Sequence, residues 1–310
     1  MKLAMQIFCR KIILNHTEVT GKEGPLLLAC NHPNSFLDAV IIAALFDRPV
    51  YSLARGDVFK NKLMNYMLRT LKMLPVYRVS EGIENLNSNY DTFNACKDIF
   101  RNNGIVLIFS EGRCVNEWHL RPLKKGTARL AIDSWQNEMP LTVLPVGINY
   151  SSFRKFGKNV FLNFGNAIHS HQFDLHQPDG ILYQQFNIKL RNELEHLVYE
   201  IADDDVKEKR RLLEVPIAPW KRAFLLLPAI LGWITHVPLY LPARLFTKNM
   251  TAHSDHYDSI IVTLLLFAYP FYLIAIAILL VVLTGSFWFI VTPIVLPLLA
   301  WSFVQLKRQT

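Results

Sequence analysis

The sequence predicts an α/β fold, with a mixed sheet flanked by helices and a C-terminal helical membrane region. Three observations predict it. Short apolar runs that end in polar loops recur along the N-terminal two thirds of the chain, as buried strands do. Stretches with apolar residues at helical spacing separate these runs, and such alternation is typical of α/β proteins. From about residue 223 onward, long uncharged runs appear that a soluble core would not need.

The expected elements follow in chain order. Residues 1–14 mix apolar and basic side chains, which suits either a short amphipathic turn on a membrane surface or an ordinary first helix. Residues 26–30 read as a buried strand that delivers the polar loop NHPNS. A helix is expected at 36–45, where apolar residues recur at helical spacing. The strand-to-loop pattern returns at 105–109 and at 141–146.

A change in composition predicts the domain boundaries. The segment ADDDVKEKRR at 202–211 is strongly charged, and the sequence beyond it becomes largely apolar. We therefore expect a folded domain at 1–205, a charged linker at 206–222 and a membrane region at 223–310.

Two segments of the membrane region predict a transmembrane hairpin. Residues 259–283 contain no charged residue over 25 positions. A helix of that length is about 37 Å long, enough to cross a hydrocarbon core of about 30 Å. Residues 287–304 are also uncharged, although Pro293 and Pro297 interrupt them, and 284–286 supply a tight turn between the two segments.

The earlier apolar run at 223–243 is expected to be interfacial or re-entrant. Three prolines and a histidine interrupt it. If it does not cross, three basic clusters share one side of the membrane, as the positive-inside rule favours. These clusters are Lys221 with Arg222, Arg244 with Lys248, and Lys307 with Arg308. We therefore expect a multi-pass membrane protein with its folded domain on the cytoplasmic side; three full crossings are the disfavoured alternative.

Net charge and cysteine content limit the kinds of partner and the cellular compartment expected for this protein. A net charge of +8 indicates an anionic partner, which could be nucleic acid, a phosphorylated substrate or an anionic membrane surface. No nucleic-acid-binding module is recognisable, and the basic residues are dispersed or flank apolar segments, so no nucleic-acid partner is expected. The four cysteines lack paired or metal-like spacing and predict free thiols in a reducing compartment: Cys9, Cys30, Cys96 and Cys114.

The stretch from Asn31 to Asp38 is the most informative for chemistry. It places His32 in a loop at a strand end and Asp38 near the first turn of the next helix. A carboxylate can hold one imidazole nitrogen while the other nitrogen takes a proton from an attacking hydroxyl. Taken alone, a capping aspartate and a buried, satisfied histidine explain the pair equally well.

Beginning at this stretch, the sequence resembles the glycerolipid acyltransferases related to bacterial 1-acylglycerol-3-phosphate acyltransferase. The first block of that family has four residues between histidine and aspartate, whereas five separate His32 from Asp38, a spacing associated with some glycerol-3-phosphate acyltransferase relatives. The segment from Arg55 to Arg78 resembles the second block. In that block the terminal arginine, here Arg78, is expected to face the phosphate of the acceptor.

Further blocks follow in the same order. Residues 109–113, FSEGR, resemble the family's Phe-Pro-Glu-Gly-Thr-Arg block, with serine in place of proline and without the threonine. The resemblance assigns Glu111, Gly112 and Arg113 to the acceptor site. Residues 121–128 resemble the segment that follows this block, where Lys124 and Lys125 would add to the positive field, and 143–147 resemble the fourth block.

The resemblance implies a membrane-bound acyltransferase in phospholipid biosynthesis. His32 and Asp38 would be catalytic, and the acceptor would be bound by Arg78, Glu111, Gly112, Arg113, Lys124 and Lys125. Acyl-CoA or acyl-carrier protein would donate the acyl group, with membrane lipids as partners and no cofactor or metal. The first expectation for the acceptor is 1-acylglycerol-3-phosphate. Glycerol-3-phosphate or another lyso-lipid is the alternative, and a noncatalytic membrane lipid-binding protein is the alternative from another class.

Overall fold

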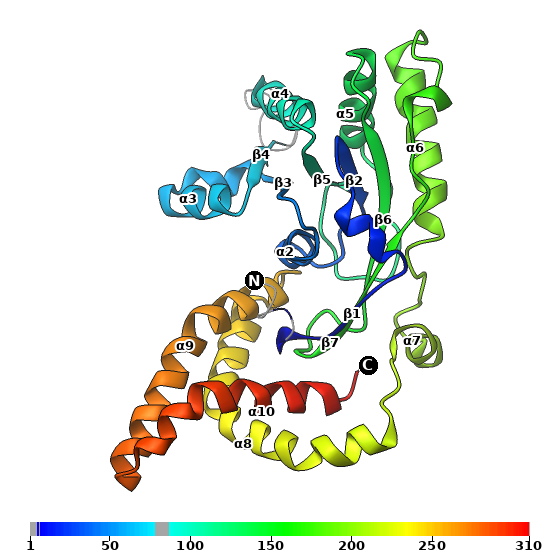
Figure 1. The fold of residues 1–310 in the computed structure, drawn as a ribbon. Coiled ribbons are helices and arrows are strands. Elements are labelled where there is room, and N and C mark those ends of the chain that lie inside the picture. The colour runs from blue at the N-terminus through cyan, green and yellow to red at the C-terminus, as the bar shows by residue number, and fades with distance from the viewer. Residues whose placement is uncertain (1–4, 6, 78–86, 310) are drawn as a thin grey trace.

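The structure, a computed structural model, describes residues 5, 7–77 and 87–309. Its centre is a seven-stranded sheet with the strand order β1-β7-β6-β2-β5-β3-β4 (Figure 1). Every neighbouring pair is parallel except β6 and β7, which are antiparallel, so the expected mixed sheet is confirmed. The strands are β1 (Cys9–Leu14), β2 (Leu26–Cys30), β3 (Val50–Arg55), β4 (Met73–Val76), β5 (Ile105–Phe109), β6 (Thr142–Tyr150) and β7 (Lys158–Phe164).

Helices cover both faces of the sheet, as the sequence predicts. Those of the N-terminal part are α2 (Phe36–Leu45), α3 (Lys62–Thr70), α4 (Asn87–Arg101), α5 (Lys125–Gln136), α6 (Asp179–Glu195) and α7 (Val206–Leu213). Short 3-10 helices are η1 (Thr17–Gly21), η2 (Gly56–Lys60) and η5 (Ser170–Gln172).

The central strand β2 shows how the two faces are divided. Leu26, Leu28 and Cys30 point into a core that includes α2, whereas Leu27 and Ala29 point into a second core with α4, α5 and α6. Alternate residues of a strand point to opposite faces, and burial on both faces explains why the sequence of β2 is uninterruptedly apolar.

Two segments fold differently from the sequence expectation. Cys9–Leu14 is a strand paired with β7, and neither a surface turn nor a helix. The segment 206–222, expected as a charged linker, contains α7, whose Leu213 is fully buried beside Phe161 and Ile201. Its charged side chains lie on the solvent-facing side of the helix. The charged composition therefore gave no sign that Leu213 attaches the helix to the core.

Three C-terminal helices are long and apolar enough to cross a membrane by length and composition. They are α8 (Pro219–Met250), α9 (Tyr257–Thr284) and the combined η6 (Phe287–Val291) and α10 (Thr292–Leu306). The run expected to be interfacial or re-entrant thus lies within one helix, α8, which continues through three prolines and bends along its length (Figure 1). The expected hairpin segments correspond to α9 and to η6 with α10.

The C-terminal helices pack directly on the sheet domain. Gln305 near the end of α10 accepts a hydrogen bond at its carbonyl from Arg10 of β1 at 3.0 Å, and its side chain donates back at 3.1 Å. At the start of α9, Tyr257 and Ile261 are buried in the same core as α2. The tip between α9 and η6 points away from the sheet (Figure 1).

Candidate active site

Strand register brings the two most informative loops together. Cys30, the last residue of β2, is paired with Phe109, the last residue of β5. Each strand continues for two residues into its loop, so His32 and Glu111 lie side by side at the carboxyl edge of the sheet. The backbone N–H of His32 donates to Oε2 of Glu111 at 2.9 Å.

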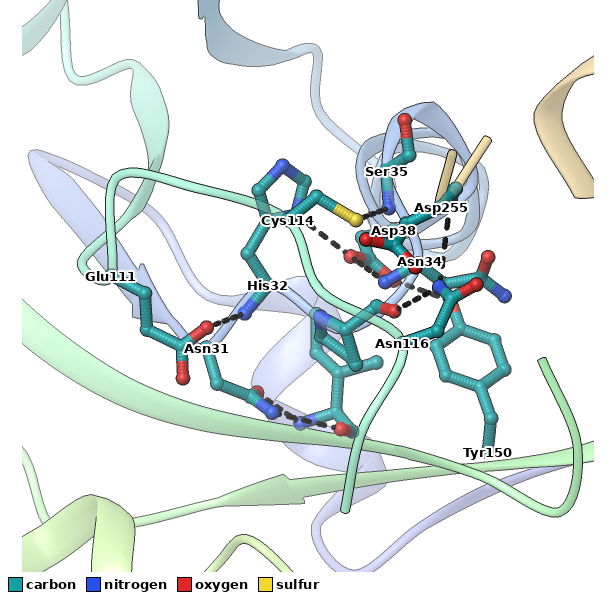
Figure 2. Close-up of polar contacts among 12 residues, drawn as sticks. Asn31, His32, Asn34, Ser35, Asp38, Glu111, Cys114, Asn116, Tyr150 and Asp255 are labelled. Carbon is teal, nitrogen blue, oxygen red and sulfur yellow. Dashed lines mark hydrogen bonds and ion pairs between the residues drawn. The ribbon is translucent and has the colours of Figure 1, made fainter. Parts of the chain in front are cut away.

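His32 and Asp38 form a hydrogen-bonded pair. Nδ1 of His32 lies 2.8 Å from Oδ2 of Asp38, and the other ring nitrogen points away from the carboxylate (Figure 2). The Asp38 side chain is fully buried, whereas 17% of the His32 side chain is exposed. The pair therefore has the geometry in which a carboxylate orients an imidazole whose second nitrogen is free to accept a proton.

Two further donors hold the Asp38 carboxylate. The backbone N–H of Asn34 donates to Oδ2 at 2.8 Å, and the Tyr150 hydroxyl donates to Oδ1 at 2.7 Å. With the imidazole, three donors satisfy a buried charge that would otherwise be costly. Burial raises the pKa of Tyr150 well above its usual value, and the Asp38 carboxylate adds to this shift, so the hydroxyl remains a donor.

The five-residue spacing between His32 and Asp38 is absorbed just before α2. Ser35 adopts a φ of 54°, in the left-handed region that L residues other than glycine rarely occupy. This turn starts the helix so that Asp38, its third residue, faces back toward the loop. The extra residue therefore does not prevent the histidine–aspartate contact.

The His32 ring is also fixed from one side. It stacks on Phe109 with 3.8 Å between ring centroids and 10° between planes. Asn31, the preceding residue, anchors the loop to β6 by exchanging hydrogen bonds with the backbone of Ile148 at 2.7 and 3.0 Å. These contacts limit the ring to one orientation before any substrate arrives.

The Glu111 side chain accepts hydrogen bonds from the backbones of two loops and so acts as a clamp between them. Its Oε1 accepts a hydrogen bond from the backbone N–H of Arg121 at 3.0 Å, and its Oε2 accepts one from the backbone N–H of His32. Only 3% of the residue is exposed. Burial raises the pKa of Glu111, although both backbone donors oppose the shift. Both oxygens are thus engaged in holding the two loops together, so its geometry fits positioning of the loops better than direct contact with a phosphate.

The expected cationic residues gather in part around Glu111. Gly112 has a φ of 65°, and a Cβ there would lie 3.0 Å from Cγ of Lys124. Lys124 and Lys125 are exposed at the start of α5, whose N-terminus has no side-chain cap, and Arg113 is exposed on the loop after β5. An uncapped helix N-terminus with nearby cations attracts anions. Arg78 lies outside the described residues.

Sequence reasoning missed three residues of the site: Asn31, Asn34 and Tyr150. The two asparagines lie inside the recognised stretch but have ordinary loop composition, and Tyr150 comes at the end of a strand 112 residues after Asp38. No local pattern could pair such distant residues. Among the described residues, no group of three or more His, Cys, Asp or Glu side chains is arranged to hold a metal ion.

Comparison with known proteins gives two findings. Residues 11–149 match the family described as Acyltransferase. The crystal structure of the 1-acyl-sn-glycerophosphate (LPA) acyltransferase PlsC from Thermotoga maritima is similar at 17% identity with a TM-score of 0.43, covering 62% of this chain and 73% of that chain. No curated protein matches the sequence. The family match includes His32, Asp38 and Glu111, with the loops that hold them.

Proposed function

The protein is an acyltransferase with its family domain at residues 11–149, and on this premise we propose that it is a membrane-bound glycerolipid O-acyltransferase. It moves a fatty acyl group from a thioester donor, acyl-CoA or acyl-carrier protein, to the hydroxyl of a phosphorylated acceptor. We propose 1-acylglycerol-3-phosphate as that acceptor. The observation that carries the proposal is the His32–Asp38 pair, with a buried carboxylate and a partly exposed imidazole.

The proposed reaction is direct transfer. His32 takes the proton of the acceptor hydroxyl on the nitrogen that faces away from Asp38, and the hydroxyl oxygen attacks the thioester carbonyl carbon. When the tetrahedral intermediate collapses, the carbon–sulfur bond breaks and the thiolate leaves with the proton from the imidazolium. Asp38 stabilises the imidazolium throughout, and no acyl-enzyme is needed.

The exposed cations support a phosphorylated acceptor. Lys124 lies beside Gly112, the residue after Glu111, which accepts a hydrogen bond from His32, and Arg113 and Lys125 are the exposed chain neighbours of Gly112 and Lys124. A phosphate bound there and at the N-terminus of α5 would be held near the catalytic loop. We include Arg78, which lies outside the described residues, as a further phosphate ligand by resemblance.

The C-terminal helices support a membrane arrangement with the catalytic domain on one side. Val215, just before α8, accepts a hydrogen bond from Arg10 at 2.9 Å, and Ser254, just after α8, accepts one from Arg154 at 3.5 Å. The segments on both sides of α8 thus contact the same domain, which favours a re-entrant helix over a crossing one. We propose that α9 and α10 cross as a hairpin, with the catalytic domain on the cytoplasmic side where basic residues accumulate.

A transfer assay with purified protein in lipid vesicles tests the function. Labelled acyl-CoA and acyl-carrier protein would each be offered with lysophosphatidate, glycerol-3-phosphate and a phosphate-free lyso-lipid. We expect lysophosphatidate to be acylated fastest. Equal acylation of the phosphate-free lipid would contradict the proposed recognition of a phosphate group. Faster acylation of glycerol-3-phosphate would make that compound the acceptor in place of lysophosphatidate. Lipid binding without turnover would favour a noncatalytic lipid-binding protein.

Substitution of the base gives the first mutational prediction. His32→Ala should lower kcat by about 10²- to 10⁴-fold, because that is the usual contribution of a general base. His176→Ala is the matched control, since His176 is exposed on a loop after β7. Full activity of the His32 variant in the same assay would exclude the catalytic assignment.

A further inference from the structure

Buried polar side chains connect the membrane region with the catalytic loop. Asp258, the second residue of α9, is 1% exposed, and Lys158 at the start of β7 is fully buried. The two form an ion pair, in which Nζ of Lys158 donates to Oδ2 of Asp258. The same Oδ2 accepts a hydrogen bond from the side-chain amide of Asn34 at 2.6 Å. Asn34 belongs to the loop that carries His32.

Asn34 links this ion pair to the catalytic carboxylate. Its side chain donates to Asp258, while its backbone N–H donates to the Asp38 oxygen that also contacts His32. One residue with no exposed surface therefore joins the start of a membrane helix to the catalytic pair through two hydrogen bonds. Figure 2 shows Asn34 next to Asp38 in the catalytic loop.

Lys158 provides a second connection to the same carboxylate. Its Nζ lies 5.7 Å from the centroid of the Tyr150 ring and 5.6 Å from that of Phe8, within the range of cation–π contacts. The hydroxyl of Tyr150 donates to Asp38. The ion pair thus braces both Asn34 and Tyr150, which are two of the three donors to the Asp38 carboxylate.

The segment that precedes α9 also contacts the catalytic loop. Nδ1 of His256 lies 2.7 Å from the Ser35 hydroxyl. The side-chain amide of Asn116 donates to the carbonyl of Pro33 at 2.8 Å and to that of Asp255 at 3.5 Å, so it bridges the two segments. Positions 34 and 35 of the loop are therefore held directly from α9 and the residue just before it, and position 33 is linked to Asp255 through Asn116.

From this network we propose that Asp258 of α9 is a positioning residue for the acyltransferase reaction, so that the membrane hairpin supplies part of the catalytic centre and is more than an anchor. The proposal rests on the acyltransferase function proposed above. Asp258 touches no reacting atom. It acts through Asn34, whose backbone N–H must stay on Asp38 for the imidazole to keep its orientation.

A charge-neutral pair of double variants separates positioning from folding. Removing one partner of a buried ion pair leaves an unpaired charge, whereas replacing both by apolar residues of similar volume is often tolerated. Asp258→Asn with Lys158→Met keeps a side-chain oxygen that can accept from Asn34. Asp258→Leu with Lys158→Met removes that acceptor. The two double variants differ only in the side chain at position 258, where only the first keeps the hydrogen-bond acceptor on which the proposal depends.

In vesicles, we expect the Asn-containing double variant to keep a kcat within a few-fold of wild type. The Leu-containing one should lose roughly 10- to 100-fold in kcat, which is the cost of a small misplacement of a catalytic group, with KM little changed. Thermal melts would establish that both are folded. Wild-type kcat in the folded Leu-containing variant would overturn the proposal.

Asn34→Ala provides an independent variant should the Leu-containing protein not fold. It removes the side-chain amide that donates to Asp258 and leaves the ion pair between Lys158 and Asp258 intact. It should lower kcat to a similar extent without changing KM, and an unchanged kcat would again overturn the proposal. Gln305→Leu is the matched control, because it breaks a contact between α10 and β1 that does not reach the catalytic loop.

The wild-type protein separates failure of this proposal from failure of the function. If wild type transfers no acyl group to any acceptor, the proposed function fails before the variants are compared. If wild type is active and the Leu-containing double variant and Asn34→Ala are equally active, only the role of Asp258 fails.

Discussion

At the scale of single residues, the site is defined by how its carboxylates are held. Asp38 is fully buried and accepts from an imidazole, a backbone N–H and a phenol. Glu111 is buried and accepts from two backbone N–H groups of different loops. Because each oxygen already has a protein donor, both carboxylates organise their surroundings, and the partly exposed His32 is left as the group that can meet a hydroxyl.

The hydroxyl of Tyr150 should matter for both stability and rate. Tyr150→Phe removes one donor to the buried carboxylate, and hydrogen bonds to charged groups contribute about 1.5–3 kcal/mol. We expect a loss of that size in the free energy of unfolding. We also expect a roughly tenfold lower kcat, equivalent to about 1.4 kcal/mol of lost orientation. Denaturation curves and transfer assays would measure the two effects.

Tyr183→Phe is the control for this prediction. Tyr183 also donates its hydroxyl to a carboxylate, Oδ2 of Asp179 at 3.1 Å, but the contact is exposed. An exposed contact of this kind should contribute little, so this variant should resemble wild type. Equal effects of the two substitutions would contradict the importance of burial around Asp38.

At the scale of elements, what the sequence could predict depends on where hydrogen-bond partners come from. β2, β5 and most of β6 are apolar on both faces, so their runs indicate buried strands directly. β7 begins with Lys158 and Asn159, which are both fully buried. Their partners include Asp258 and Gln309, about 100 and 150 residues later. A polar strand start of this kind does not look buried until the tertiary contacts are known.

The candidate site divides in the same way. His32, Asp38 and Glu111 are predictable because each lies in a short motif at a strand end. Tyr150 and Asp258 are not, because one belongs to a strand and the other to α9, and each joins the site only through a contact with distant residues. Similarly, the prolines of α8 suggested an interrupted segment, whereas the helix is continuous. Packing on neighbouring helices can compensate for the hydrogen bonds that proline removes.

The contact between α8 and α10 gives an element-scale prediction. A Cβ on Gly232 would lie 2.2 Å from the backbone oxygen of Leu299, so the two helices approach too closely for any side chain. Gly232→Leu should force them apart and lower the free energy of unfolding by about 1–3 kcal/mol, as overpacking usually does. Gly180→Ala in α6 meets nothing within 4 Å and is the control. Thermal melts in detergent would compare them, and an unshifted melt for the Gly232 variant would contradict this packing.

The end of α10 gives a prediction for pH dependence. Burial, reinforced by Arg244, Lys155 and Lys158 and opposed by Asp258, lowers the pKa of Lys307 to about 8 from a usual 10.5. Between these two values the unfolded chain binds more protons than the folded one, so the contribution of Lys307 to stability increases as pH rises from about 8 to 10.5.

Lys307→Met should remove this increase. Melting temperatures would be measured between pH 7 and 10.5 for both proteins. As pH rises, the melting temperature of the variant should increase less, or decrease more, than that of wild type. Lys207→Met, at an exposed position of α7, provides the background. Parallel curves for wild type and the Lys307 variant would mean that this amine is not responsible.

At the scale of the whole molecule, the proposed membrane arrangement depends on how the three long C-terminal helices sit on the sheet domain. The segments on both sides of α8 and Lys307, just after α10, contact the sheet domain. The tip between α9 and η6 projects away from it (Figure 1), and the tip residues Phe287 and Trp288 are 80% and 84% exposed. A lipid environment would cover these side chains.

Cysteine labelling tests this arrangement. Ala252→Cys lies between α8 and α9, and Ser286→Cys lies at the far tip. In sealed membrane vesicles, a membrane-impermeant thiol reagent should reach the cysteine at 252 only from the side of the catalytic domain and the one at 286 only from the opposite side. Wild type sets the background of the four native thiols, three of which are buried. If both cysteines were labelled from the same side, the crossing hairpin would be contradicted. If each were labelled only from the side opposite to the one expected, the proposed orientation would be contradicted.

The buried ion pair also has a consequence for biosynthesis. Lys158 is translated 100 residues before Asp258, so the ribosome completes the entire sheet while this amine still lacks its counter-charge. Burial of an unpaired charge is unfavourable, and until α9 follows, the strand start and the Asn34 loop lack the contacts that Asp258 makes with them. A nascent or truncated chain would therefore hold a nearly complete domain with a less well-ordered catalytic loop. In the proposed membrane arrangement, full activity would come with the hairpin, at the time and place of its entry into the bilayer.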